Sequence, residues 1–261
     1  MFRGTLIRSG NNAKTVKGDG EFETAIMYLA PFTLAGSNVC PMAEQAGCIA
    51  GCLNTAGRGR MTNVQIARIN KTKRYLASRA AFMAELVDNL ERFVRYCERK
   101  GVKPAVRLNG TSDIQWEVAH PVERVAAGDW VGQYASVFDA FPEVQFYDYT
   151  KVYKRVYRKL PANYSLTLSY SGANVAYSEA IVKAANETGA NVAVVYRTKE
   201  QRDTLAAFDC AGLATATDFH LNRPVFDGDK TDLRFTDPKG VIVGLFAKGA
   251  AKQDNSGFVL G

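Results

Sequence analysis

From residue 104 onward, short apolar segments alternate with amphipathic ones, and this alternation limits the possible fold more than any other feature of the chain. A strand–helix repeat of about 25 residues implies parallel strands joined by helical crossovers. With a first strand at residues 24–32, the pattern predicts an α/β fold, and we favour a complete or partial TIM-like β/α barrel with parallel strands over an open sheet. The later strands are expected at residues 104–109, 143–149, 164–170, 190–196 and 241–246, and the helices between them at 151–160, 174–187 and 198–208.

Two further helices are expected between the first strand and this repeat. Ser78 is a suitable N-cap and Gly101 a suitable C-terminal stop for a helix over residues 79–100. An earlier helix, residues 62–77, is expected to bury Ile66, Ile69 and Leu76. The apolar residues of the longer helix fall on one face at helical spacing: Phe82, Leu86, Leu90, Phe93, Val94 and Cys97.

Length and composition limit the class of protein. The 261 residues are 47% hydrophobic, which is enough for a substantial core, and no apolar run reaches membrane-spanning length. No linker or change of composition divides the chain, so we expect one domain over residues 1–261, with an irregular N-terminal segment at 1–22. This polar segment lacks a signal-peptide core, so we expect a cytosolic protein with reduced cysteines.

Positive charge is concentrated in one region. Residues 58–103 contain twelve Lys/Arg and four Asp/Glu, a balance of +8, whereas the whole chain carries +7. Such a region can bind nucleic acid, and residues 149–160 interleave tyrosines with basic residues in a way that suits single strands. We favour solvated helix faces for the first region and a helix packed on the sheet for the second, so nucleic-acid binding stays an alternative.

Three of the five cysteines lie within thirteen residues, in the sequence CPMAEQAGCIAGC. Thiols as dense as Cys40, Cys48 and Cys52 are either cross-linked or hold a metal, and a reducing compartment disfavours a disulfide. Cys97 and Cys210 lie among apolar residues of expected helices, so we interpret both as core residues.

The number of thiols distinguishes between metals. Zinc and two-iron clusters take four protein ligands, but residues 30–70 contain no histidine and only one carboxylate, Glu44. His120 and His220 lie far away in the sequence. A 4Fe–4S cluster held by three thiolates keeps one iron open for a ligand, so we favour this cluster, with zinc and structural cysteines as alternatives.

Other residues around this motif suit a cluster. Gly47 and Gly51 precede two of the cysteines and let backbone amides approach the sulfurs. Arg58 and Arg60 follow the motif and are candidates to offset the negative charge of a thiolate-bound cluster. The DGDKTD segment at residues 227–232 lacks the full spacing of a calcium loop, and we interpret it as a polar turn.

Candidate ligand-binding residues follow the expected strands, because function gathers at the carboxyl ends of parallel strands. We expect a small-molecule ligand to bind at the open iron beside such residues, although any single one can equally be a cap or a turn. The catalytic candidates are Asn109, Thr111, Asp113, Tyr149 and Ser171.

The stretch CPMAEQAGCIAGCLNTAGRGR, followed by a long helix and then AVRLNGTSD, resembles a bacteriophage family called gene product eighty-eight. The likeness runs from the cysteine motif to the second strand, roughly half of the chain. It implies a viral protein made in the cytoplasm of a bacterial host or carried in the virion, with a 4Fe–4S cluster on Cys40, Cys48 and Cys52.

The layout is also similar to that of radical S-adenosylmethionine enzymes, which place three cysteines after the first strand of a partial β/α barrel. The spacing here is Cys-x7-Cys-x3-Cys, whereas those enzymes use Cys-x3-Cys-x2-Cys. This likeness implies that S-adenosylmethionine is one candidate ligand of the open iron, in a redox or radical-type enzyme. The alternative is a non-enzymatic cluster protein that binds a host or virion partner.

Overall fold

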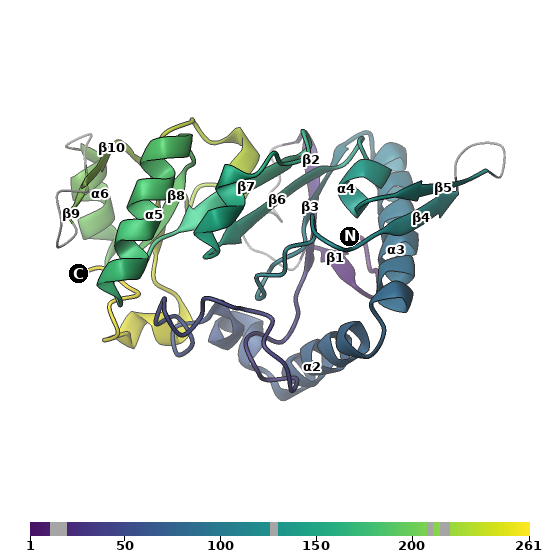
Figure 1. The fold of residues 1–261 in the computed structure, drawn as a ribbon, viewed down its shortest axis with the longest axis horizontal. Coiled ribbons are helices and arrows are strands. Elements are labelled where there is room, and N and C mark those ends of the chain that lie inside the picture. Colours follow the sequence, from purple (N-terminus) through teal and green to yellow (C-terminus); the bar gives the residue numbers. More distant parts are fainter. Residues whose placement is uncertain (11–19, 126–129, 208–210, 215–219) are drawn as a thin grey trace. The chain divides into compact units, whose positions relative to one another are not determined.

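The computed structural model describes residues 1–10, 20–125, 130–207, 211–214 and 220–261 (Figure 1). Eight strands form a sheet in the order β1-β2-β3-β6-β7-β8-β12-β11. The helices are α2 (Thr62–Ala77), α3 (Arg79–Lys100), α4 (Val137–Ala140), α5 (Val175–Thr188) and α6 (Lys199–Ala207). The sheet strands are β1 (Ile7–Ser9), β2 (Phe22–Met27), β3 (Lys103–Arg107), β6 (Gln145–Thr150), β7 (Tyr164–Ser169), β8 (Val192–Tyr196), β11 (Val225–Asp227) and β12 (Ile242–Phe246).

The expected parallel pairing is confirmed, but the expected barrel is not. β2 pairs in parallel with β3, β3 with β6, β7 with β8, and β12 with both β8 and β11. At one end of the order, however, β1 pairs antiparallel with β2, and among the described strands β1 and β11 stand at opposite ends. The fold is therefore a mixed α/β structure around an open, mostly parallel sheet, because the strand order does not return to its beginning.

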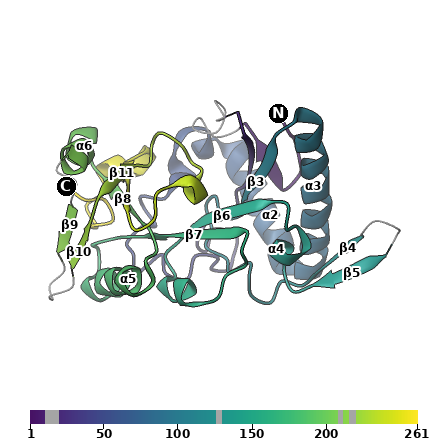
Figure 2. The ribbon, with the colours of Figure 1, turned by 90° about the horizontal axis from the view of Figure 1, so that it is seen from above.

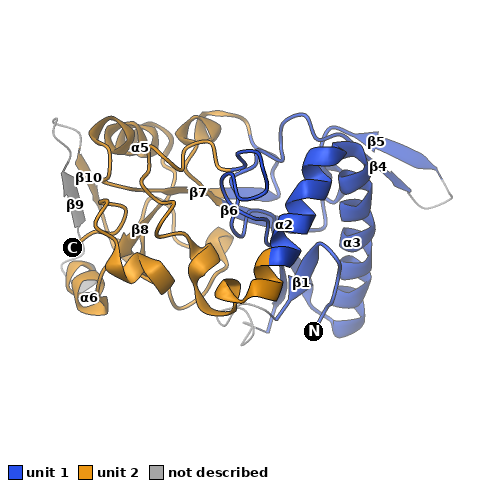
Figure 3. Cartoon of the chain, turned by 90° about the horizontal axis from the view of Figure 1, so that it is seen from below, with its two compact units in different colours: residues 1–39, 66–148, 160–165 blue, residues 40–65, 149–159, 166–261 orange. Residues whose placement is uncertain are grey.

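Backbone contacts divide the chain into two compact units, coloured separately in Figure 3. Unit 1 comprises residues 1–39, 66–148 and 160–165, and unit 2 comprises residues 40–65, 149–159 and 166–261. Unit 1 also contains the hairpin of β4 (Val122–Val125) and β5 (Val131–Tyr134). Unit 2 contains β9 (Ala211–Ala214) and β10 (His220–Arg223), which pair antiparallel.

Helix α3 forms as its sequence predicts. The Ser78 hydroxyl accepts a hydrogen bond from the Ala81 amide at 3.3 Å, and Gly101 ends the helix with a left-handed φ of 69°. All six apolar residues expected on the inner face are buried. Each buried aliphatic or aromatic side chain of this kind stabilises the fold by about 1.5–3 kcal/mol, so this face holds α3 on unit 1 beside β3 (Figure 2).

Helix α2 has the expected bounds but not the expected inner face. Ile66 is 52% exposed and Leu76 is 38% exposed, whereas Arg68 and Thr72 are buried. The Thr72 hydroxyl accepts a hydrogen bond from the Ala30 amide at 2.8 Å, and the Arg68 guanidinium lies 4.8 Å from the centre of the Tyr28 ring. The polar side is buried because its hydrogen bonds and its cation–π contact are made inside unit 1.

The core of unit 2 lies between α5 and the strands β7, β8 and β12. Figure 2 shows α5 beside β7 and β8. The segment expected to form a helix over residues 151–160 is instead a short 3₁₀ helix, η3 (Tyr153–Tyr157), and Tyr153 and Val156 pack against this core. Arg155 is fully buried. The tyrosine–basic pattern is therefore used in part for packing, and one of its cations is inaccessible to phosphate. The remaining short helices are η1 (Leu53–Thr55), η2 (Gly57–Arg60), η4 (Arg234–Thr236) and η5 (Gly249–Gln253).

His120 belongs to a buried aromatic cluster in unit 1. Its Nδ1 lies 2.6 Å from the Val118 carbonyl oxygen and therefore carries the proton, so its Nε2 accepts from the Tyr75 hydroxyl at 2.9 Å. Trp116 packs 5.0 Å from the imidazole, centre to centre. Burial lowers the pKa of His120 below its usual value, and the positive charge of Arg79 acts in the same direction.

We expect this histidine to make folding depend on pH. The pKa of His120 is lower in the folded than in the unfolded chain. Its contribution to the free energy of unfolding is therefore complete at a pH above the unfolded pKa of about 6.5. The contribution is lost as the pH falls through the folded value, since protonation breaks the bond from Tyr75. Urea unfolding at pH 7.5 and pH 5 measures the loss, and His120→Gln should reduce it. His220→Gln at the exposed histidine should leave it unchanged; an equal effect of both variants would contradict the prediction.

Candidate metal centre

The cysteine motif forms an irregular loop at the start of unit 2, ahead of η1. Cys40, Cys48 and Cys52 are all partly exposed thiols in this loop. Cys97, in contrast, is fully buried on α3, and burial raises the pKa of its thiol to about 12. Cys97 is therefore a core residue, as expected, while Cys210 lies outside the described residues.

Two serines from distant parts of the sequence hold the middle of the loop. The Ser171 hydroxyl donates to the Ala46 carbonyl oxygen at 2.7 Å, and the Ser256 hydroxyl donates to the Gly47 carbonyl oxygen at 2.9 Å. Ser171 follows β7 and is fully buried. The loop is thereby fixed to the carboxyl end of β7 and to the C-terminal segment, with its cysteines on either side of the fixed point.

The two glycines of the motif lie against the rest of unit 2. Gly47 has a φ of +59°, and a Cβ atom there would lie 2.6 Å from the Ala173 Cβ atom. A Cβ atom on Gly51 would lie 2.9 Å from Cδ1 of Phe258. Both positions therefore require glycine for close approach of the backbone, and Gly47 requires it also for its left-handed conformation.

Two of the sulfur atoms have hydrogen-bond partners in the loop itself. The Cys52 sulfur caps η1 by accepting from the Asn54 amide at 3.5 Å, and the Cys48 thiol donates to the Ala43 carbonyl oxygen at 3.8 Å. Amide-to-sulfur bonds such as the first stabilise negative charge on a thiolate. This geometry suits Cys52 as a metal ligand.

The thiols have the right chemistry for iron, but they are not gathered around one point. Among the described residues, no three side chains of histidine, cysteine, aspartate or glutamate lie close enough together to hold a metal ion. A cluster on these three cysteines therefore requires the parts of the loop on either side of Ala46 and Gly47 to close around it. Arg58 and Arg60 lie on η2, after the third cysteine, and both are exposed.

The five catalytic candidates do not form one group. Tyr149 and Ser171 belong to unit 2, where the first packs against Ala193, Val241 and Val243, and the hydroxyl of the second holds the loop. Asn109, Thr111 and Asp113 belong to unit 1.

The three candidates in unit 1 all make hydrogen bonds within that unit. The Thr111 hydroxyl donates to the Leu29 carbonyl oxygen at 2.5 Å, and the Asp113 amide donates to the Val39 carbonyl oxygen at 2.9 Å. Asn109 bonds to several buried groups through both atoms of its amide. These contacts agree with the alternative that residues at the ends of strands are caps and turns.

The acidic segment after β11 is an ion-paired turn. Nη1 of the buried Arg202 lies 2.8 Å from Asp227 Oδ1 and 2.8 Å from Asp229 Oδ2. Asp229 also accepts a hydrogen bond from the Phe246 amide at 2.8 Å. The carboxylates are therefore neutralised by an arginine, which agrees with the polar turn expected from the sequence.

A protein-family model described as Gene product 88 matches residues 5–260. The chain belongs to the gene product 88 family. This confirms the resemblance carried by the cysteine motif and extends it from half of the chain to nearly all of it. No curated protein and no solved structure matches the sequence.

For this member of the gene product 88 family, the barrel layout of radical S-adenosylmethionine enzymes is not supported. The cysteine loop does follow a parallel strand, β2, but that strand also pairs antiparallel with β1 in an open sheet. The likeness to those enzymes is thus limited to three cysteines after an early strand. In the part of the chain that the structure describes, no helix is long and apolar enough to cross a membrane.

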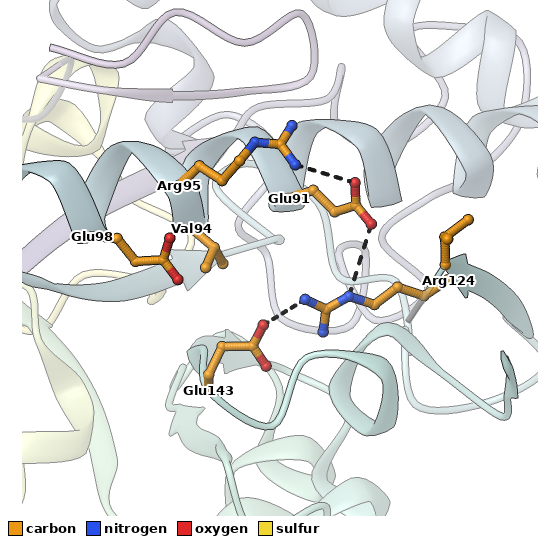
Figure 4. A pocket seen from close by; sticks show the side chains of 7 residues that line it. Glu91, Val94, Arg95, Glu98, Arg124 and Glu143 are labelled. Carbon is orange, nitrogen blue, oxygen red and sulfur yellow. Dashed lines mark hydrogen bonds and ion pairs between the residues drawn. The ribbon is translucent and has the colours of Figure 1, made fainter. Parts of the chain in front are cut away.

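A hollow of about 350 Å³ in unit 1 is lined mainly by charged residues (Figure 4). Arg124 lies 2.7 Å from Glu143 and 3.9 Å from Glu91, and Arg95 lies 3.6 Å from Glu91 (Figure 4). Its two arginines are thus paired with carboxylates on its own walls, which makes this hollow a weaker candidate for a ligand site than the cysteine loop.

Proposed function

We propose that this protein binds a 4Fe–4S cluster through Cys40, Cys48 and Cys52 and leaves one iron open to a small-molecule ligand. The observation that carries this proposal is the arrangement of the thiols: three partly exposed cysteines belong to one loop of one unit, held at its centre by two serines. Iron favours thiolate ligands, and three of them suffice for a cluster with an open site.

The neighbouring residues have separate parts in this proposal. The Asn54 amide stabilises the Cys52 thiolate, and the bonds from Ser171 and Ser256 fix the loop while its cysteines close around the metal. Arg58 and Arg60, on the exposed η2, supply positive charge beside a negatively charged centre. Coupling of metal binding to local ordering is usual, since the ligands are seldom gathered beforehand.

When bound, such a cluster supplies electron transfer and an open coordination position. This chemistry suits a redox or radical-type enzyme in the cytoplasm of a bacterial host, with S-adenosylmethionine as one possible ligand of the open iron. The chain's own part is to hold the cluster at the carboxyl end of β7, where ligand sites gather in parallel sheets.

Anaerobic purification followed by iron and sulfide analysis and a visible spectrum tests the proposal. We expect about four iron and four sulfide atoms per chain and a brown protein. A colourless protein loaded with zinc would overturn the cluster assignment. If the cluster is present, S-adenosylmethionine added to the reduced protein should change its EPR signal. An unchanged signal would favour a non-enzymatic cluster protein that binds a host or virion partner.

A further inference from the structure

A lysine and a serine meet at the carboxyl ends of two neighbouring strands in unit 2. Lys151 directly follows β6, and Ser169 is the last residue of β7. The Lys151 Nζ donates to the Ser169 Oγ at 2.9 Å, and both side chains are partly exposed. A ligand from solvent can therefore reach this pair.

The backbone beneath the pair is fixed by one tyrosine. The hydroxyl of the buried Tyr177, on α5, lies 2.9 Å from the Ser169 carbonyl oxygen and 3.3 Å from the Lys151 carbonyl oxygen. This bifurcated bond ties the ends of β6 and β7 to the first turn of α5. The pair is therefore positioned before any ligand arrives, which lowers the entropic cost of binding.

The lysine also lies over an aromatic ring. Its Nζ lies 4.6 Å from the centre of the Phe258 ring, and a cation is attracted to the face of an aromatic ring. A serine–lysine pair that activates the serine as a nucleophile needs a neutral amine instead. The pair is therefore suited to binding an anion rather than to acyl transfer.

The same phenylalanine connects the pair with the cysteine loop. The ring of Phe258, which the Lys151 ammonium approaches, also lies against Gly51, the residue before Cys52. Lys151 and Ser169 therefore lie beside the loop, within the same unit. A ligand that contacts this pair also reaches the neighbourhood of the third cysteine.

We propose that Lys151 and Ser169 form a binding site for an oxyanion, the carboxylate or phosphate group of a small molecule. The ammonium supplies charge, and a hydroxyl that accepts from an ammonium keeps its own proton to donate to an anionic oxygen. The link to a ligand of the open iron rests on the proposed function, whereas the anion site itself does not.

Calorimetric titration of the full-length protein with inorganic phosphate, and separately with acetate, at constant ionic strength tests this site. We expect saturable binding of at least one anion, weakened about tenfold in Lys151→Met and at least about threefold in Ser169→Ala. Lys154→Met, at an exposed lysine of η3, removes the same charge nearby and should bind as the wild type does. Saturation by phosphate alone identifies a phosphate ligand, and saturation by acetate alone identifies a carboxylate.

Absence of saturable binding of both anions to folded wild-type protein would overturn the site, as would wild-type affinity in Lys151→Met. If Lys151→Met fails to fold, Ser169→Ala decides, because it removes only one hydroxyl; unchanged affinity there overturns the site. The iron-free Cys40→Ser variant separates the two proposals. Anion binding that persists in Cys40→Ser supports the anion site, even if the wild-type protein proves to contain no iron. A wild-type protein that contains iron but binds no anion contradicts the anion site and leaves the cluster proposal intact.

Discussion

Each of the three single substitutions Cys40→Ser, Cys48→Ser and Cys52→Ser should remove the cluster from the anaerobically purified protein. Iron should fall from about four atoms per chain to below one, because a cluster with three thiolate ligands has no protein ligand to spare. A serine hydroxyl is a harder donor with a much higher pKa than a thiol, so it holds iron poorly under the same conditions. Iron and sulfide per chain, with the visible absorbance of the cluster, measure the loss.

Cys97→Ser is the matched control for these variants. Its thiol is fully buried on α3, with its pKa raised to about 12 by burial, so it is unsuited to bind iron as a thiolate. This variant should keep its iron and lose about 1–2 kcal/mol of stability, because a hydroxyl is buried where the thiol was. Full iron content in any one of the three loop variants, or iron lost from a folded Cys97→Ser protein, would refute the ligand assignment.

The local structure of this chain follows from local sequence signals. Helix α3 begins after Ser78 and ends at Gly101 because a capping hydroxyl and a glycine in left-handed conformation satisfy its terminal backbone groups. The parallel strands β3, β6, β7, β8 and β12 were expected from short segments rich in apolar residues that alternate with amphipathic ones. Of these, β8 (VAVVY) and β12 (IVGLF) are apolar along most of their length, as is usual for buried parallel strands. These features depend on residues that are close together in the sequence.

The closure of the sheet could not be predicted in this way. A barrel and an open sheet use the same strand–helix repeat, and they differ only in which strands stand at the edges. Here the three residues of β1 pair antiparallel with β2, a contact across the N-terminal segment that has no periodic signal. Likewise, the inner face of α2 was misjudged because Thr72 is satisfied by the amide of Ala30, which is 42 residues away.

The candidate site shows the same division. The crowding of Cys40, Cys48 and Cys52 is visible in the sequence, whereas the serines that hold their loop come from the chain beyond β7 and from its last residues. Lys151 and Ser169 were visible only as polar residues at the ends of strands, a class that also contains Asn109. Sequence alone cannot distinguish a polar residue that binds a ligand from one whose hydrogen bonds are already made within the protein.

Asn109→Ala should destabilise unit 1 by about 3–4 kcal/mol, which is a large effect for a single buried polar residue. The Asn109 side-chain oxygen accepts from the Ser112 hydroxyl, the Ile114 amide and Trp116 Nε1 at 2.9–3.1 Å. Its Nδ2 donates to the Ile114 carbonyl oxygen and to Asp148 Oδ2 at 2.9 and 3.2 Å. Alanine leaves buried donors and acceptors without these bonds, and urea unfolding followed by circular dichroism measures the cost.

Asn255→Ala, at an exposed asparagine, is the control and should change stability by less than about 0.5 kcal/mol. Asn109→Asp separates the two halves of the amide. It keeps an acceptor for the Ile114 amide and Trp116 but turns a carboxylate toward Asp148, which is fully buried. Two like charges at that distance repel strongly, so this variant should also be destabilised, and less so at a pH low enough to protonate one of the pair. Asn109→Ala with the stability of the wild type would contradict this structural role and would leave Asn109 as a candidate ligand-binding residue.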